Sequence, residues 1–487
     1  MMRRFLPILL LLIAVIAAPI IMRRSSELAA ASQAQDRLVI ITPHNETIRS
    51  EFGEAFAAYW KNKTGRTLYI DWRIPGGTSD ITRVINSSFE AAEEIKSSGI
   101  GTDIFFGGGE PDFATHAKKG RFVPLEVFTT HPQWFKEDII PAKFTGENYY
   151  DVKHLWVGTC LSQMGICYNS DSITRLKIVP PYRWEDLADP AYFGYIALAD
   201  PTKSGSVTRM YEMMIQEQMK KVIKEKGDSD ASKEEGWKRG LNLLQAMAAN
   251  ARYFTDAASK IPHDVAQGDA VAGTCIDFYG RSYEEKLGKR GPSRLIWTAP
   301  LGGTSISVDP IAVFRGAPSP QIAQEFVTFV LSDQGQLLWN LKVGIPGGPR
   351  EASPRRLPVR KDLYTPENIT GKFADPVALP YERSGGFEYR WRPHRRYVQC
   401  PAPDLPRHVH GPPPGDEAGL AGDPGIGEVR IRLHRHGSLR PLLRYLPPQL
   451  RPREEGTRPP RRAEGQYGQA RGLPRNGPHL RRLPREL

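Results

Sequence analysis

The chain has 487 residues, enough for two or three domains, and its 40% hydrophobic and 25% charged residues are ordinary for a soluble globular protein. The net charge of +12 suggests a nucleic-acid partner, but residues 391–487 alone hold 19 Arg, no Lys and 9 acidic residues, which leaves about +2 for the first 390. We exclude nucleic-acid binding by the main domain, because a phosphate-binding surface needs its basic residues on a folded face.

The N-terminal residues predict a signal peptide or a membrane anchor. A basic start at residues 1–4 precedes an almost unbroken apolar run over residues 5–22, and a small-residue stretch follows Arg23 and Arg24. This order is typical of a secretory signal peptide within residues 1–35. The run also approaches the length of ~20 residues that spans a bilayer, so an uncleaved inner-membrane anchor stays open. Both alternatives predict a periplasmic or other extracytoplasmic location for the rest of the chain.

Four cysteines are present, and they are too few for a disulfide scaffold and too scattered for a zinc ribbon. They are Cys160, Cys167, Cys275 and Cys400. We expect buried, inert thiols, although a disulfide between Cys275 and either Cys160 or Cys167 stays open in an oxidising compartment.

The first part of the chain alternates strands with amphipathic helices. Strands are predicted at residues 37–42, 67–72 and 102–106, with helices over 48–60 and 81–89 between them. This alternation predicts a parallel sheet, and ligands bind at the loops beyond the carboxyl ends of such strands. The residues expected to meet there are His44, Asn45, Gly76, Gly77, Thr78, Gly108, Gly109 and Glu110.

The second part repeats the pattern. Residues 156–158 and 164–169 are predicted as strands crossing between two lobes, and residues 195–199 as a buried strand. The loop after that strand contains Ser204, Gly205 and Ser206 at the start of a helix, where free N–H groups favour an anion. The competing interpretation is an ordinary serine N-cap without a ligand.

Residues 270–281 are predicted as a further strand running into a loop. Alternation along that strand would place Asp277, Tyr279 and Arg281 on one face, and we expect all three to contact the ligand. Residues 304–314 are predicted as a strand, and two amphipathic helices follow around residues 332–336.

A family resemblance emerges from the segments after residue 308. Asp-Pro-Ile-Ala-Val at residues 309–313, Gly-Ala-Pro at 316–318 and the helix pair over 326–337 resemble the ferric-ion and related solute-binding proteins of ABC importers. The resemblance covers residues 37–390. It implies two Rossmann-like α/β lobes joined by hinge strands, the type 2 periplasmic-binding fold, with a ligand in a cleft that closes on binding. It also implies a monomer that delivers its ligand to a membrane permease and has no enzymatic activity.

On this basis, residues 36–390 form the binding domain. The first lobe is expected at about 36–150 plus 300–345, and the second at about 151–299 plus 346–390.

The resemblance implies a ferric ion as the first candidate ligand. Ferric relatives hold the metal with tyrosine phenolates, and oxygen donors suit this hard cation. Tyr279 and, more loosely, His44 match these positions, but the adjacent second tyrosine of the family is replaced by Gly280. Iron would be cargo, and no cofactor is expected. Thiamine or its phosphates, phosphonates, sugar phosphates and polyamines remain alternatives, with an anionic solute ranked narrowly second.

Other classes of protein are less well supported. The sequence has no GxSxG, HExxH or GxxxxGK[ST] motif and no ligand-spaced histidine pair, so an enzyme is not expected. A membrane-tethered ligand sensor stays open.

The C-terminal tail differs from the rest of the chain. Residues 391–487 contain 17 prolines and show no hydrophobic periodicity. Two hypotheses account for this composition: a disordered basic arm, or out-of-frame translation after a frameshift near residues 390–395.

Overall fold

The computed structural model describes residues 33–390 apart from 202, 289–290, 376–379 and 383–385. The predicted signal peptide or anchor, Cys400 and the tail over residues 391–487 lie outside the described residues. Within that part of the chain, no helix is long and apolar enough to cross a membrane.

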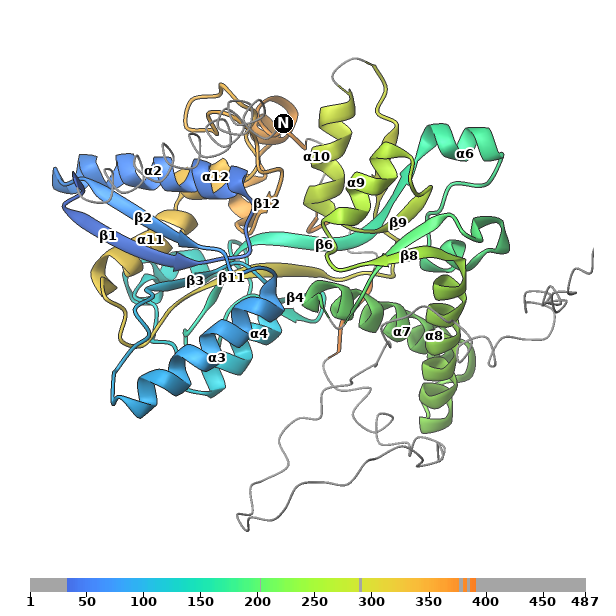
Figure 1. Ribbon diagram of the computed structural model, residues 1–487, viewed down its shortest axis with the longest axis horizontal. Coiled ribbons are helices and arrows are strands. Elements are labelled where there is room, and N and C mark those ends of the chain that lie inside the picture. The colour runs from blue at the N-terminus through green and yellow to red at the C-terminus, as the bar shows by residue number, and fades with distance from the viewer. Residues whose placement is uncertain (1–32, 202, 289–290, 376–379, 383–385, 391–487) are drawn as a thin grey trace, which may run out of the picture. The chain divides into compact units, whose positions relative to one another are not determined.

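One ten-stranded sheet organises these residues (Figure 1). Its main path runs through β2 (Leu68–Arg73), β1 (Asp36–Ile41), β3 (Ile104–Phe106), β11 (Ile306–Val313), β6 (Val157–Asn169), β9 (Ala272–Ile276), β7 (Ile196–Ala199) and β8 (Ala251–Thr255). The short strands β10 (Leu295–Thr298) and β12 (Leu357–Pro358) also pair with β6.

The strand directions confirm the predicted α/β architecture. Strand β1 is parallel to β2 and β3, and β7 is parallel to β8 and β9, whereas β11 is antiparallel to β3 and β6. The parallel strands are connected through helices, as the alternating pattern requires. The carboxyl ends of β1, β2 and β3 therefore lead into neighbouring loops at one edge of the sheet.

The larger helices follow these strands. They are α2 (Glu46–Thr64), α3 (Thr78–Glu94), α4 (Glu110–Lys118), α7 (Gly205–Lys226), α8 (Asp230–Asn250), α9 (Lys260–Gln267), α10 (Asp277–Gly288) and α11 (Pro320–Leu331). Shorter ones are α5 (Val127–Thr130), α6 (Ser170–Leu176) and α12 (Asp333–Leu338), and β4 (Lys143–Phe144) forms a small hairpin with β5 (Glu147–Asn148). Helix α3 shows why they form: Ile81, Ile85 and Phe89 recur at helical spacing, and all three are buried.

Strand β6 belongs to both lobes. Its residues 157–163 pair with β11, and residues 164–169 pair with β9 and β10. The two crossing strands predicted from sequence are thus one continuous strand of 13 residues. Separate hydrophobic cores lie on either side of the crossing: Leu38, Phe106 and Val313 belong to one, and Ile196, Met214 and Cys275 to the other.

The C-terminal part of the described chain divides between the two cores. Leu357 and Val359 pack in the same core as Leu38, whereas Phe387 and Tyr389 pack with Met214 in the other. The expected assignment of residues 346–390 to the second lobe alone does not match this division, because β12 pairs with the first-lobe portion of β6.

The prediction of an extended strand over residues 270–281 was wrong beyond Ile276. The strand ends there, and Asp277 begins helix α10. Helical spacing places Asp277 and Arg281 on one face and turns Tyr279 away from that stripe. The alternation that grouped all three side chains does not exist.

The cysteines within the described residues are buried free thiols, as expected: Cys160, Cys167 and Cys275.

One buried glutamine joins three segments of the first lobe. The fully buried Gln336 side chain donates hydrogen bonds to the carbonyls of Thr159 (2.7 Å) and Val330 (2.9 Å) and accepts one from the Val359 amide (2.9 Å). The Gln336 side chain therefore links β6, α11 and the segment after β12. The three residues that it contacts are fully buried, so water cannot replace these hydrogen bonds.

We expect Gln336→Leu to lower the free energy of unfolding by about 3 kcal/mol, because each buried group left unpaired costs ~1–3 kcal/mol. Urea denaturation measures this change. The exposed Gln334 on the same helix supplies the control Gln334→Leu, which should change stability by less than about 0.5 kcal/mol. Equal stability of the two variants would contradict the role of Gln336.

Candidate functional site

Residues from the first three strand–helix loops lie close together. The loop after β3 passes directly against His44, because a Cβ atom on Gly107 would collide with the imidazole, and Gly107 has a φ of 87°. Only glycine accepts both that backbone angle and that approach without strain. His44 is 4% exposed, and its Nε2 atom has no hydrogen-bond partner within the described part of the chain.

Thr78 lies where loops of the two lobes meet. A Cβ atom on Gly108 would collide with the Thr78 methyl group, and one on Gly205 would lie 3.3 Å from the Thr78 hydroxyl. The starts of α3 and α7 therefore face one another, with the Gly108 loop beside them. This brings together the predicted residues Thr78, Gly108, Gly109, Ser204, Gly205 and Ser206.

Three other predicted residues are directed elsewhere. The Asn45 side chain caps α2 by accepting a hydrogen bond from the Ile48 amide at 3.1 Å. Gly76 and Gly77 are exposed, and the Gly77 amide donates to Asp80 at 3.2 Å. These residues perform local turn and capping roles, which are the ordinary uses of their residue types.

Two predicted charges of the second lobe pair with each other at the start of α10. Asp277 and Arg281 are 1% and 7% exposed and form an ion pair at 3.2 Å. The Arg281 guanidinium also lies 5.0 Å from the Trp297 ring centroid. Tyr279 is half-buried, and burial raises the pKa of its phenol, although the nearby Arg356 opposes that rise.

The centre of this polar cluster is Arg356, which the sequence analysis missed. Its Nη2 atom pairs with the carboxylate of Asp309 on β11 at 2.8 Å. Its guanidinium lies 3.9 Å from the ring centroid of Phe278 on α10, so it contacts both lobes. Arg356 is 4% exposed, and its Nε and Nη1 atoms have no hydrogen-bond partner within the described residues.

Burial and neighbouring charges shift the pKa values of the groups around Arg356. Burial, then the charge of Arg356, holds the pKa of His44 well below its usual range, so the imidazole is neutral. Burial raises the pKa of Asp277 and of Asp309, while Arg356 acts in the opposite direction on both. Burial lowers the pKa of Arg356, but the acidic groups around it, Asp309 first, together raise that pKa by more, and the guanidinium stays a cation.

One feature of the sequence could have indicated this pair, and the structure adds a second. Asp309 is a charged residue within the apolar strand Ile306–Val313, and a buried charge requires a partner. A β-bulge between Asp309 and Pro310 interrupts its pairing with β6. The consecutive arginines 355 and 356 supply that partner, but no spacing rule connects residue 309 with residue 356.

A second polar group lies beside the Thr78 contact. Glu147 of the β5 hairpin forms an ion pair with Arg209 of α7 at 2.5 Å and accepts a hydrogen bond from Ser305 at 2.6 Å. Glu110, at the start of α4, is 6% exposed, and its Oε2 atom has no hydrogen-bond partner within the described chain. Burial raises its pKa to about 7, with Arg209 lowering it and Glu147 raising it.

The chemistry of the cluster suits an anion better than a metal. A guanidinium with unpaired nitrogens offers hydrogen bonds and positive charge to carboxylate or phosphate oxygens. Within the described residues, no group of three His, Cys, Asp or Glu side chains is arranged to hold a metal ion. His44 and Tyr279 are the predicted metal ligands, and both face the charge of Arg356.

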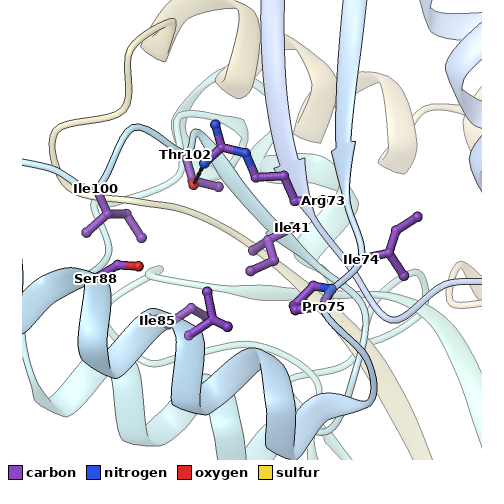
Figure 2. Close-up of a pocket in the computed structure, with 9 residues that line it drawn as sticks. Ile41, Arg73, Ile74, Pro75, Ile85, Ser88, Ile100 and Thr102 are labelled. Carbon is purple, nitrogen blue, oxygen red and sulfur yellow. Dashed lines mark hydrogen bonds between the residues drawn. The ribbon is translucent and has the colours of Figure 1, made fainter. Parts of the chain in front are cut away.

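A separate pocket of about 340 Å³ lies in the first lobe between β2 and α3 (Figure 2). Its wall is mainly aliphatic, and Arg73 donates a hydrogen bond to Thr102 across it at 2.9 Å. None of the predicted site residues lines it. Its lining is Ile41, Arg73, Ile74, Pro75, Val84, Ile85, Ser88, Ile100 and Thr102.

Comparison with known proteins identifies relatives. The profile of a family described as bacterial extracellular solute-binding protein matches residues 102–364, just over half of the chain. An uncharacterized protein of Haemophilus influenzae is 25% identical over 266 residues, which are 54% of this chain and 67% of that protein. The phosphoglycerate transport regulatory protein PgtC of Salmonella typhimurium is 23% identical over 180 residues, 37% of this chain but only 39% of PgtC.

A solved structure supports the fold. The substrate-binding protein of an ABC transporter from Agrobacterium tumefaciens superposes with a TM-score of 0.53 at 15% identity, covering 73% of this chain and 86% of that one. This likeness confirms the predicted two-lobed periplasmic-binding fold.

The raised pKa of Glu110 predicts a pH dependence of stability. The folded pKa of about 7 exceeds the unfolded value of 4.5, so the folded state binds this proton more tightly, and stability falls as pH rises from 4.5 through 7. Relative to Glu110→Gln, the wild-type chain should lose about 2–3 kcal/mol between pH 5 and pH 8 in urea denaturation. The exposed Glu94 provides the control Glu94→Gln, whose free energy of unfolding should change with pH as that of the wild type does. A constant difference between wild type and Glu110→Gln would rule out the titration.

Proposed function

The chain belongs to the bacterial extracellular solute-binding proteins, and on that premise we propose that it delivers a small organic anion to an ABC import system. The family places its work outside the cytoplasm, in the periplasm, and its partner is a transporter permease. We propose that the solute binds where the two lobes meet and that the protein acts as a monomer. Its predicted contacts are His44, Thr78, Gly108, Gly109, Glu110, Ser204, Gly205, Ser206, Asp277, Tyr279 and Arg281, now joined by Arg356.

The observation that carries this proposal is the state of Arg356. Its guanidinium contacts one residue from each lobe and is almost wholly buried, yet two of its three nitrogens have no hydrogen-bond partner within the described residues. Unpaired buried donors on a charged group are costly. An oxyanion bound beside it would satisfy them, and closure of the lobes would then depend on ligand.

An anion is favoured over ferric iron for an electrostatic reason. Iron needs ionised phenolate or carboxylate ligands, and burial raises the pKa of the Tyr279 phenol, which adds to the cost of ionising it. Arg356 would also repel a trivalent cation. Neutral His44 and the facing helix starts of α3 and α7 are compatible with phosphate or carboxylate oxygens.

A phosphate-bearing solute is the specific candidate. The partial relative PgtC carries phosphoglycerate in its name. That compound presents a phosphate and a carboxylate, both of which suit a guanidinium with free donors.

The first test is a thermal-shift screen of the full chain with inorganic phosphate, 3-phosphoglycerate, fructose 6-phosphate, thiamine phosphate, a phosphonate, spermidine and ferric citrate. A ligand that binds only the folded state raises Tm. We expect the largest shift with a phosphorylated organic anion. A larger shift with ferric citrate that is lost in Tyr279→Phe would overturn the proposal.

Substitution of Arg356 tests the anchor itself. We expect Arg356→Lys to weaken binding of that anion at least tenfold in calorimetry, because lysine cannot reproduce the guanidinium geometry. Exposed Arg350 in the same segment supplies the control Arg350→Lys, which should bind normally. The double variant Arg356→Met/Asp309→Leu removes both buried charges, so it should stay folded and lose binding. Unchanged affinity in folded Arg356 variants would contradict the assignment.

A further inference from the structure

A buried carboxyl group with an unpaired oxygen faces the contact between the lobes. Glu110 begins helix α4, two residues after Gly108, and is 6% exposed. Asn148 makes only a long contact of 3.5 Å to Oε1, and Oε2 has no hydrogen-bond partner among the described residues. Such a group is costly to bury unless a donor reaches it.

The neighbouring cation is already engaged. Arg209 pairs with Glu147 at 2.5 Å and lies 3.7 Å from Glu212, and its guanidinium stacks on the Tyr389 ring at 3.4 Å. Glu147 adds negative charge beside Glu110 and raises its pKa. This end of the contact between the lobes is therefore acidic and accepts hydrogen bonds.

The acidic end lies close to the cationic end. The loop from Gly107, which touches His44, to Glu110 spans at most about 11 Å, since consecutive residues advance by at most about 3.6 Å. Asp309, the partner of Arg356, accepts a hydrogen bond from the Gly108 backbone within the same loop. Arg356, through Asp309, and Glu110 are therefore both connected to this one short loop.

We propose that Glu110 accepts a hydrogen bond from a hydroxyl group of the bound anion, so that the site selects hydroxylated phosphates over their deoxy counterparts. This inference rests on the proposed function, because it assumes that Arg356 holds the anionic group. A hydroxyl donates to the unpaired Oε2 atom, whereas a methylene group leaves that atom buried and unsatisfied. Sites built around a buried hydrogen-bonding group reject analogues that lack the matching hydroxyl.

The test compares two probes that differ only in hydroxyl groups. Glycerol 3-phosphate and propyl phosphate are titrated by calorimetry into the full-length wild-type chain, Glu110→Leu and Glu110→Gln. We expect the wild type to bind glycerol 3-phosphate at least tenfold more tightly. The ratio of the two Kd values should fall towards one in Glu110→Leu, while Glu110→Gln, which keeps one acceptor oxygen, should reduce it less.

The matched control is Asp112→Asn on the same helix. The Asp112 carboxylate already accepts a hydrogen bond from the Thr82 hydroxyl at 3.1 Å. Asp112→Asn should keep the wild-type ratio of the Kd values for the two probes. Circular dichroism confirms that each variant is folded, and Glu110→Gln keeps the test decisive if Glu110→Leu does not fold. An unchanged ratio in a folded Glu110 variant would overturn the inference while leaving the proposed function intact. Binding of neither probe by the wild-type chain would overturn the inference, and the thermal-shift screen decides the proposed function separately.

Discussion

The burial of one guanidinium governs the organisation of the site. Arg356 stays charged in the interior because Asp309 pairs with it, the Phe278 ring lies against it and Asp277 adds negative charge nearby. Its charge, together with burial, keeps His44 neutral and opposes protonation of Asp277 and Asp309. A buried ion pair is not in itself a strong source of stability, and the unpaired nitrogens of Arg356 add to its cost. Under the proposed function, ligand recognition is the reason for retaining it.

The backbone is adapted to that arrangement. The bulge between Asp309 and Pro310 interrupts the pairing of β11 with β6 at the residue that carries the carboxylate. Gly107 lets the loop after β3 approach the imidazole of His44, and the Gly108 amide donates to Asp309. Because β6 continues from one lobe into the other, these first-lobe groups lie within reach of α10.

The polar groups between the lobes form two ends of opposite character. Arg356 and neutral His44 can donate to an anion, whereas Glu110 and Glu147 form an acidic end around Arg209. This polarity suits a molecule with an anionic group at one end and hydroxyl groups at the other. Burial, together with the charge of Glu147, raises the pKa of Glu110 at the acidic end to about 7.

The sequence by itself determined the alternation of strands and helices and the loops at the strand ends, because hydrophobic periodicity and turn residues are local properties. It placed His44, Thr78 and the residue 107–110 loop at one edge of the sheet for the same reason. The two-lobed fold was expected from the family resemblance of residues 37–390. The sequence misjudged α10, where a short apolar run fits a strand and a helix start equally well. Only the tertiary structure decided that Arg356 meets Asp309 and that Glu110 lies beside Arg209. These partners are 47 and 99 residues apart in the sequence, and their contact depends on how the strands cross between the lobes.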